Sequence, residues 1–265
     1  MTLRDALMQY KEIPPDQDIA NIIECYWLCT NTADDYQQQI LPDGCIDIVC
    51  DLTGFHDIEV IGTYSQTKSL KINHGFKKLG IRFKPGQFRA FTKINAEELK
   101  DHEVCIDNYI KPSQKLMLAE KLAGNNGNII GALNQYLKSA LEYDHQYRQL
   151  FNDITSKLTS SICSGRVTVD DICCYTGYSR QHLRRLFLEY VGVTLKEFID
   201  ITRIRVISQN INHLTYSEWL NTACDAGFHD QSHLSSHFRK YISMSPKKYH
   251  DLKATMLHFY NTKSA

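Results

Sequence analysis

The alternation of hydrophobic and polar residues predicts several short strands in the first hundred residues. The segment ILPDGCIDIVCDLTG begins with a Pro-Asp-Gly turn and then alternates Ile46, Ile48 and Cys50 with Asp47 and Asp51. The segments DIEVIGTYSQ, SLKIN and KLGIRFKPG repeat this short pattern and are separated by Gly and Pro residues. The sequence therefore predicts a strand-rich unit, either an α+β fold or a small barrel.

After Pro112 the hydrophobic pattern takes a helical period. QKLMLAEKLA ends at GNNGN, which is a helix stop, and the next helix places Ile130, Leu133, Leu137 and Leu141 on one stripe. Packing onto its own domain is the commoner use of such a stripe, and a dimer seam is the alternative. From Asp144 onward the pattern predicts only helices. We therefore expect two domains, 1–143 and 144–265, in an α+β protein with an all-α C-terminal half.

Two stretches of the C-terminal half share one layout, VTVDDICCYTGYSRQHLRRLFLEY and YSEWLNTACDAGFHDQSHLSSHFRKY. Each predicts a short helix, a glycine followed by an aromatic residue, an N-cap and a second amphipathic helix. Gly177 and Gly227 can adopt the positive φ of a tight turn, and Ser179 and Asp230 are favourable N-cap residues. This layout predicts two helix-turn-helix units, each with a second helix that enters a major groove of DNA.

Helical spacing assigns the faces of the two second helices. Leu183, Leu186 and Phe187 form the expected buried stripe of the first, and Leu234, Phe238 and Tyr241 that of the second. The outward residues of the first helix include Arg and Gln, whose donors and acceptors match the edges of guanine and adenine. A solvated helical face is the alternative for either helix alone, and two copies in tandem favour DNA. The outward, candidate DNA-binding residues are Arg180, Gln181, His182, Arg184 and Arg185, then Gln231, Ser232, Ser235, Ser236 and Arg239.

Roughly the last hundred residues resemble the AraC/XylS family of bacterial transcription regulators. The resemblance lies in SRQHLRRLF, GVTLKEFIDITRIR and ACDAGFHDQSHLSSHFRKY…SPKKYH, and the matching positions are Arg203, Ala223, Gly227, Phe228, Phe238, Pro246 and Tyr249. It implies two helix-turn-helix units joined by one long helix, at about Lys196 to Ile211, which places the recognition helices in successive major grooves about 34 Å apart. Partners implied in this way are promoter DNA and RNA polymerase, which such proteins recruit or block.

The resemblance also assigns roles by position and shows departures. Base contacts fall to Gln181, Arg184 and Arg185 in the first unit and to Gln231, Ser232 and Ser236 in the second. Arg180, His182 and Arg239 are expected to contact phosphates. The sequence departs from the family pattern at four positions, where it has Ser236 in place of an arginine, Thr222 in place of an aliphatic residue, Ser243 in place of a glycine and Leu195 in place of a proline. We therefore predict that the first unit dominates sequence readout. A non-glycine residue at a left-handed position costs about 1 kcal/mol, so we expect the helix junction at Ser243 to be either strained or shaped differently.

The N-terminal half resembles an uncharacterised module that precedes AraC-type DNA-binding domains. Its LPDG turn and GIRFKPG segment carry this resemblance, which covers roughly Ile23 to Asn108 and implies sensing of a small-molecule effector or homodimer formation. A cupin-like barrel is the form this role commonly takes in the family. Candidate ligand contacts are Trp27, Tyr64, Arg82 and Phe83, with Asp43 and Asp47 as polar partners. The plainer alternatives are a turn role for Asp43 and a core position for Phe83.

The zero net charge of the chain conceals an asymmetry between its two halves. Residues up to Tyr143 carry 15 Lys and Arg against 19 Asp and Glu, whereas the remainder carries 15 against 11 and holds 8 of the 11 histidines. A basic C-terminal half is typical of a polyanion-binding module, although four charges are also within random surface variation. No apolar run approaches the ~18 residues of a membrane span, and the N-terminus has no signal-like segment. We therefore expect a cytoplasmic protein.

The chemical alternatives have less support in the sequence. The chain lacks GxSxG, P-loop, GxGxxG and HExxH motifs, so we expect no enzyme. Two cysteine pairs, Cys25 with Cys29 and Cys45 with Cys50, are the candidates for a zinc site like that of methyl-accepting modules, or for a redox sensor. Neither pair has the two-residue gap that is usual for a zinc site. Nine cysteines, an odd number, fit reduced thiols, and we expect neither metal nor cofactor. A ligand-independent regulator that only oligomerises or binds a protein partner remains the main alternative.

Overall fold

The computed structural model describes residues 8–53, 57–123, 128–141, 147–162, 165, 167–209, 214–228 and 230–252 of the 265-residue chain. We call 8–141 the N-terminal part and 147–252 the C-terminal part. The strands are β1 (Met8–Ile13), β2 (Ile23–Asn31), β3 (Tyr36–Ile40), β4 (Ile46–Asp51), β5 (Ile58–Ile61), β6 (Lys68–Ile72), β7 (Lys77–Phe83) and β8 (Glu103–Cys105). The four strands expected from alternation are confirmed as β4 to β7. The predicted boundary at 143/144 lies outside the described residues.

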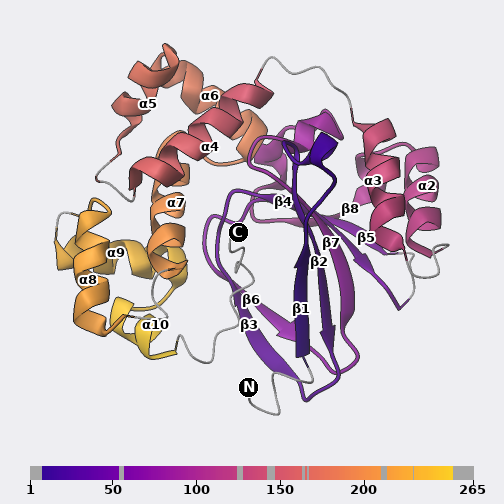
Figure 1. Ribbon diagram of the computed structural model, residues 1–265, viewed down its shortest axis with the longest axis horizontal. Coiled ribbons are helices and arrows are strands. Elements are labelled where there is room, and N and C mark those ends of the chain that lie inside the picture. The colour runs from indigo at the N-terminus through magenta and orange to yellow at the C-terminus, as the bar shows by residue number, and fades with distance from the viewer. Residues whose placement is uncertain are drawn as a thin grey trace.

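Nine α-helices are described, and Figure 1 shows two of them beside the sheet and the others on its opposite side. The first two, α2 (Pro112–Ala123) and α3 (Ile129–Ala140), belong to the N-terminal part. The C-terminal part contains α4 (Arg148–Ile162), α5 (Val169–Thr176), α6 (Arg180–Val191), α7 (Leu195–Gln209), α8 (Tyr216–Asp225), α9 (Gln231–Ile242) and α10 (Pro246–Leu252). Short 3-10 turns lie at η1 (Gln17–Ile19), η2 (Phe88–Ala90), η3 (Ala96–Leu99) and η4 (Ile106–Asn108). The all-helical C-terminal half is confirmed over its described residues.

The N-terminal strands form two open sheets, so the expectation of a cupin-like barrel is wrong. Six strands pair antiparallel in the order β1-β2-β7-β4-β5-β8, and β3 pairs with β6 in a separate two-stranded sheet. Closure requires the two edges of one sheet to meet, and within the described strands β1 and β8 each pair with a single neighbour. The α+β class of the N-terminal part is confirmed.

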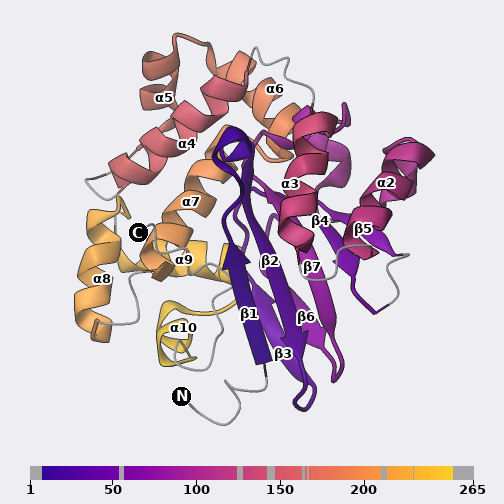
Figure 2. The ribbon, with the colours of Figure 1, turned by 45° about the vertical axis from the view of Figure 1, so that its right-hand side comes forward.

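The two faces of the six-stranded sheet pack into different cores. Ile46, Ile48 and Cys50 point into a core that they share with the helical pair α2–α3, where Leu133 and Leu137 are fully buried. The leucine stripe therefore packs onto its own sheet and is not available as a dimer seam. Figure 2 shows the helix that carries it, α3, lying against this sheet. On the opposite face Trp27 and Val49 join the core of the C-terminal helices. Since the chain alternates sides along β4, a single strand contributes to both cores.

Hydrogen bonds and close packing join the two parts. Gln87 donates to the Arg148 carbonyl at 3.0 Å, and Asn152 donates to the Asn21 carbonyl at 3.0 Å. A Cβ atom added to Gly44 would lie 2.5 Å from the ring of Phe198 on α7, so only glycine permits this approach. The C-terminal helices are thus fixed against the sheet, and no helix in the described ranges is long and apolar enough to cross a membrane.

Of the two alternatives for Ser243, the strained left-handed position is the one observed, because its φ and ψ are 61° and 20° at the C-cap of α9. We expect Ser243→Gly to raise the free energy of unfolding by up to about 1 kcal/mol. Glycine removes the Cβ clash, and its greater freedom in the unfolded chain offsets part of that gain. Chemical unfolding of both proteins measures the difference. Ser243→Val is the opposite control and should lower stability, because a β-branched residue tolerates positive φ poorly.

Candidate nucleic-acid interface

The first helix-turn-helix unit has the local geometry that the sequence predicts. A capping box between Thr168 and Asp171 starts α5, and hydrogen bonds from Thr168 lower the pKa of the Asp171 carboxyl. Gly177 ends α5 with a φ of 74°, and the Ser179 hydroxyl then accepts from the His182 N–H at 3.2 Å to start α6. The stripe of Leu183, Leu186 and Phe187 is at most 1% exposed, which leaves the opposite side of α6 in solvent.

The second unit repeats this geometry with different residues. Thr215 and Glu218 form a capping box at the start of α8, and hydrogen bonds from Thr215 lower the pKa of Glu218. Gly227 has a φ of 94°, and Asp230 accepts from the His233 N–H at 2.7 Å to start α9. Leu234, Phe238 and Tyr241 are at most 1% exposed. The predicted turns, caps and buried stripes are confirmed in both units.

The outward side of α6 presents most of the predicted DNA contacts of the first unit. Gln181, Arg184 and Arg185 are exposed, and none of the described ion pairs involves either arginine. Arg180 forms an ion pair with Asp170 of α5, so a phosphate contact there competes with this carboxylate. His182 is half-buried, and its ring stacks on Tyr178 at a centroid distance of 4.6 Å. Their roles in DNA binding stay predictions, and the structure favours the three exposed residues.

The outward side of α9 forms a shallow depression of about 420 Å³ lined by Gln231, Ser232, Ser235, Ser236 and Arg239. Four of these residues are exposed, and Ser235 is half-buried. Serine side chains are short, so this surface offers fewer long donors than α6 does. The difference supports the prediction that α6 contributes more to base readout.

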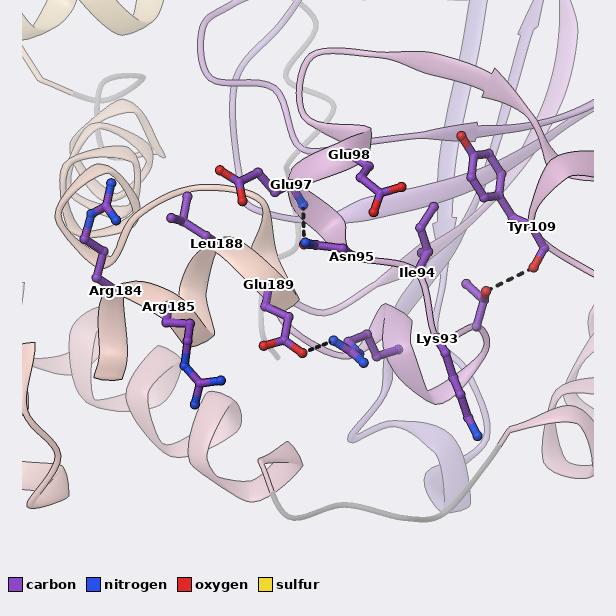
Figure 3. Close-up of a pocket in the computed structure, with 12 residues that line it drawn as sticks. Lys93, Ile94, Asn95, Glu97, Glu98, Tyr109, Arg184, Arg185, Leu188 and Glu189 are labelled. Carbon is purple, nitrogen blue, oxygen red and sulfur yellow. Dashed lines mark hydrogen bonds and ion pairs between the residues drawn. The ribbon is translucent and has the colours of Figure 1, made fainter. Parts of the chain in front are cut away.

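A groove of about 840 Å³ lies between α6 and the N-terminal part (Figure 3). Arg184, Arg185 and Leu188 line one side, and Glu97 and Glu98 are among the residues opposite. Arg89, which also lines the groove, pairs with Glu189 of α6, and its guanidinium lies 4.6 Å from the centroid of the Tyr190 ring. The lining carries four cationic side chains against three carboxylates, so its charge does not set this groove apart from the rest of the α6 surface as a place for a polyanion.

Arg203 on α7 links the two units. Its guanidinium donates to the Val167 carbonyl at 3.0 Å, pairs with Asp200 at 3.2 Å and lies 5.5 Å from the centroid of the Phe228 ring. Asp200 also accepts from the Tyr241 hydroxyl at 3.3 Å. The connecting helix predicted at Lys196 to Ile211 is observed as Leu195–Gln209, and the rest of the predicted range lies outside the described residues. Sequence reasoning found Arg203 by resemblance but not its contacts.

The structure brings together four of the predicted ligand contacts in the N-terminal part. Trp27, Asp47, Tyr64 and Arg82 line a cavity of about 70 Å³ between the six-stranded sheet and the β3–β6 pair. Asp47 accepts from Trp27 Nε1 at 2.9 Å and from Arg82 Nε and Nη2 at 3.1 and 2.9 Å. Burial raises the pKa of Asp47, and the opposite effect of Arg82 limits that rise.

Asp43 lies in a turn and Phe83 in the core, as the alternatives to a ligand-binding role predict. Asp43 accepts from the Cys45 N–H at 2.9 Å, which closes the Asp-Gly turn, and it is not among the residues that line this cavity. It lies 3.8 Å from Arg82 Nε, behind the Arg82–Asp47 pair. Phe83 is fully buried and packs edge-on against Phe88 at a centroid distance of 5.1 Å. Phe83 therefore loses support as a candidate ligand contact, whereas Asp43 lines a separate cavity of about 660 Å³ between the two parts.

The four cysteines that are candidates for a reactive or metal-binding group are buried thiols. Cys25, Cys29, Cys45 and Cys50 are at most 6% exposed. Burial raises the pKa of Cys29 to about 12 and that of Cys50 to about 11, so both are protonated at neutral pH. Within the described ranges no three His, Cys, Asp or Glu side chains are grouped as a metal would require. These cysteines have the properties of small hydrophobic core residues.

Comparison with known proteins separates the chain into two matched regions. Residues 172–251 match a helix-turn-helix domain family, and residues 11–105 match a domain of unknown function (DUF6597). The HTH-type transcriptional activator AarP of Providencia stuartii is 28% identical over 117 residues, which are 43% of this chain and 86% of AarP. The transcriptional regulatory protein HptR of Staphylococcus aureus is 29% identical over 127 residues, which are 47% of this chain and 48% of HptR. The matched region thus spans about half of HptR.

Among solved structures, ToxT from Vibrio cholerae aligns with 92% of this chain and 97% of its own at 15% identity and a TM-score of 0.44. The sequence matches to AarP and HptR, together with the helix-turn-helix match, agree with the two units built by α5–α6 and α8–α9. Residues 172–251 are therefore an AraC-type helix-turn-helix domain, of the kind found in these transcriptional regulators.

Proposed function

We propose that this protein binds promoter DNA sequence-specifically by placing α6 and α9 in successive major grooves. The observation that supports it most strongly is the presence of two complete helix-turn-helix units, each with an exposed polar face on its second helix. Gln181, Arg184 and Arg185 would read bases on α6, and Gln231, Ser232 and Ser236 on α9. Arg180, His182, Ser235 and Arg239 would contribute to the backbone contacts.

We further propose that the chain divides at about residue 143 into a control domain and the DNA-binding domain. The cavity of Trp27, Asp47, Tyr64 and Arg82 supports an effector site, since convergent polar groups surround an apolar space. At about 70 Å³ it accepts a group of a few heavy atoms, so a larger effector requires the β3–β6 pair to move. RNA polymerase would be the partner once DNA is bound.

Self-association is the second candidate for control. Leu116 and Met117 on α2 are 61% and 46% exposed, and α2 lies on the outer side of the N-terminal part, away from the C-terminal helices (Figure 1). Exposed neighbouring apolar side chains favour an interface. A homodimer formed through α2 would carry four helix-turn-helix units, enough for two half-sites.

Genome-wide occupancy by the purified full-length chain, followed by a salt titration on its best site, tests the DNA-binding proposal. We expect one motif composed of two submotifs about one helical turn apart. We also expect the specific site to stay preferred over random DNA between about 50 and about 200 mM salt, although both affinities fall as counterions compete. Occupancy without a motif, lost over the same salt range, would contradict base readout and leave only phosphate binding.

A further inference from the structure

A single loop of the N-terminal part contacts both recognition helices. The loop is Gly62–Thr67, between β5 and β6. The Thr63 hydroxyl donates to the carbonyl of Val191, the last residue of α6, at 2.6 Å. The N–H and the hydroxyl of Thr67 each donate to the carbonyl of Tyr241, next to the end of α9, at 2.8 Å. Since the last carbonyls of a helix lack intrahelical partners, the loop supplies donors to the same end of both helices.

The loop is held in one conformation by the segment that follows η3. The Gly62 N–H donates to the His102 carbonyl, and the Asp101 N–H donates to the Thr63 carbonyl, both at 3.0 Å. The Asp101 carboxylate accepts from the Ser65 N–H at 2.7 Å and from its hydroxyl at 2.8 Å. A Cβ atom on Gly62 would lie 1.8 Å from the Leu99 carbonyl oxygen, so the loop cannot approach this segment with any larger residue.

We propose that Gly62–Thr67 is a rigid spacer that fixes the position of α6 relative to α9, with Thr63 and Thr67 as positioning residues for DNA readout. This inference rests on the proposed function, in which both helices read one operator. Between the two attachment points the ring of Tyr64 lines the cavity, and its hydroxyl donates to Glu103 at 2.6 Å. A ligand in the cavity would therefore contact the spacer itself, and the operator spacing that the protein prefers would change with occupancy.

The double variant Thr63→Val with Thr67→Val tests the spacer. Affinity is measured for the best operator and for matched operators in which the gap between the submotifs is one base pair longer or shorter. We expect the wild-type protein to discriminate among these spacings and the double variant to lose about fivefold to tenfold of that discrimination, since two hydroxyl donors are gone and the Thr67 N–H remains. Thr63→Ser with Thr67→Ser keeps both hydroxyls and should keep the discrimination. Gln66→Ala, at an exposed position of the same loop, is the matched control.

The outcomes separate this inference from the proposed function. A wild-type protein with no sequence preference would contradict the proposed function. The spacer role would be contradicted if the wild-type protein discriminates among the spacings and the double variant loses the same factor of affinity for every spacing. Thr63 and Thr67 would then have only a general stabilising role. If the double variant fails to fold in thermal unfolding, Thr67→Val alone is compared in the same way, since Thr67 is only half-buried.

Discussion

Arg185→Ala is expected to lower the affinity for the best operator by about 5- to 150-fold, which corresponds to about 1–3 kcal/mol for a lost base contact. Arg185 is exposed on α6, and a guanidinium there can donate two hydrogen bonds to one guanine. The loss should be concentrated at one or two positions of the first submotif. A binding assay against single-base operator variants, made with the full-length chain, measures both the loss and its position.

Two matched variants make the Arg185 result interpretable. Gln231→Ala on α9 should cost less specificity, because Ser232 and Ser236 leave the second unit with short side chains. Equal losses of specificity from Arg185→Ala and Gln231→Ala would contradict the prediction that the first unit dominates readout. Arg239→Ala should weaken binding to all sequences alike and reduce the slope of log affinity against log salt by about 1, as expected for a phosphate contact.

Arg203→Met is expected to lower the free energy of unfolding by about 3–5 kcal/mol. Arg203 is 4% exposed, and its removal leaves Asp200, itself 8% exposed, without its cationic partner. It also removes the hydrogen bond to Val167 ahead of α5 and the contact with the Phe228 ring ahead of α9. Denaturant unfolding of the full-length chain measures the loss through the shift in midpoint.

Arg205→Met is the matched control, two residues further along the same helix. Arg205 is a quarter exposed, and its ion-pair contact with Glu24 is 4.0 Å long, so this variant should cost less than about 1 kcal/mol. Replacing the buried pair together, as Arg203→Met with Asp200→Leu, should recover part of the loss because no unpaired charge stays buried. Similar stabilities for Arg203→Met and Arg205→Met would contradict the role of Arg203 as the link between the units.

The local features of the DNA-binding half could be predicted because they depend on neighbouring residues. The turn at Gly177, the N-caps at Ser179 and Asp230 and the left-handed Ser243 follow from rules of spacing and backbone geometry. The capping boxes at Thr168 and Thr215 carry the same kind of signal, a threonine three residues before an acidic side chain, and a scan for that pattern would have found them.

The N-terminal part was predicted less completely, because strand pairing joins residues that are distant along the chain. Alternation located β4 to β7, but it does not say which strands pair, so it could not separate an open sheet from a barrel. Four of the predicted ligand contacts converge on one cavity, while Asp43 closes a turn and Phe83 lies in the core. For short segments, periodicity gives the face of a residue but not its neighbours.

Residue patterns along the chain were enough to locate the two helix-turn-helix units, their exposed faces and the strand-rich character of the region before them. Each of these follows from the propensities and spacing of a few consecutive residues. Three features became visible in the folded chain alone: the sheet is open, Arg203 joins the two units, and Thr63 and Thr67 of one loop contact the ends of both recognition helices. Thr67 and Tyr241 are 174 positions apart, so their contact depends on how the whole chain packs, which no local pattern encodes.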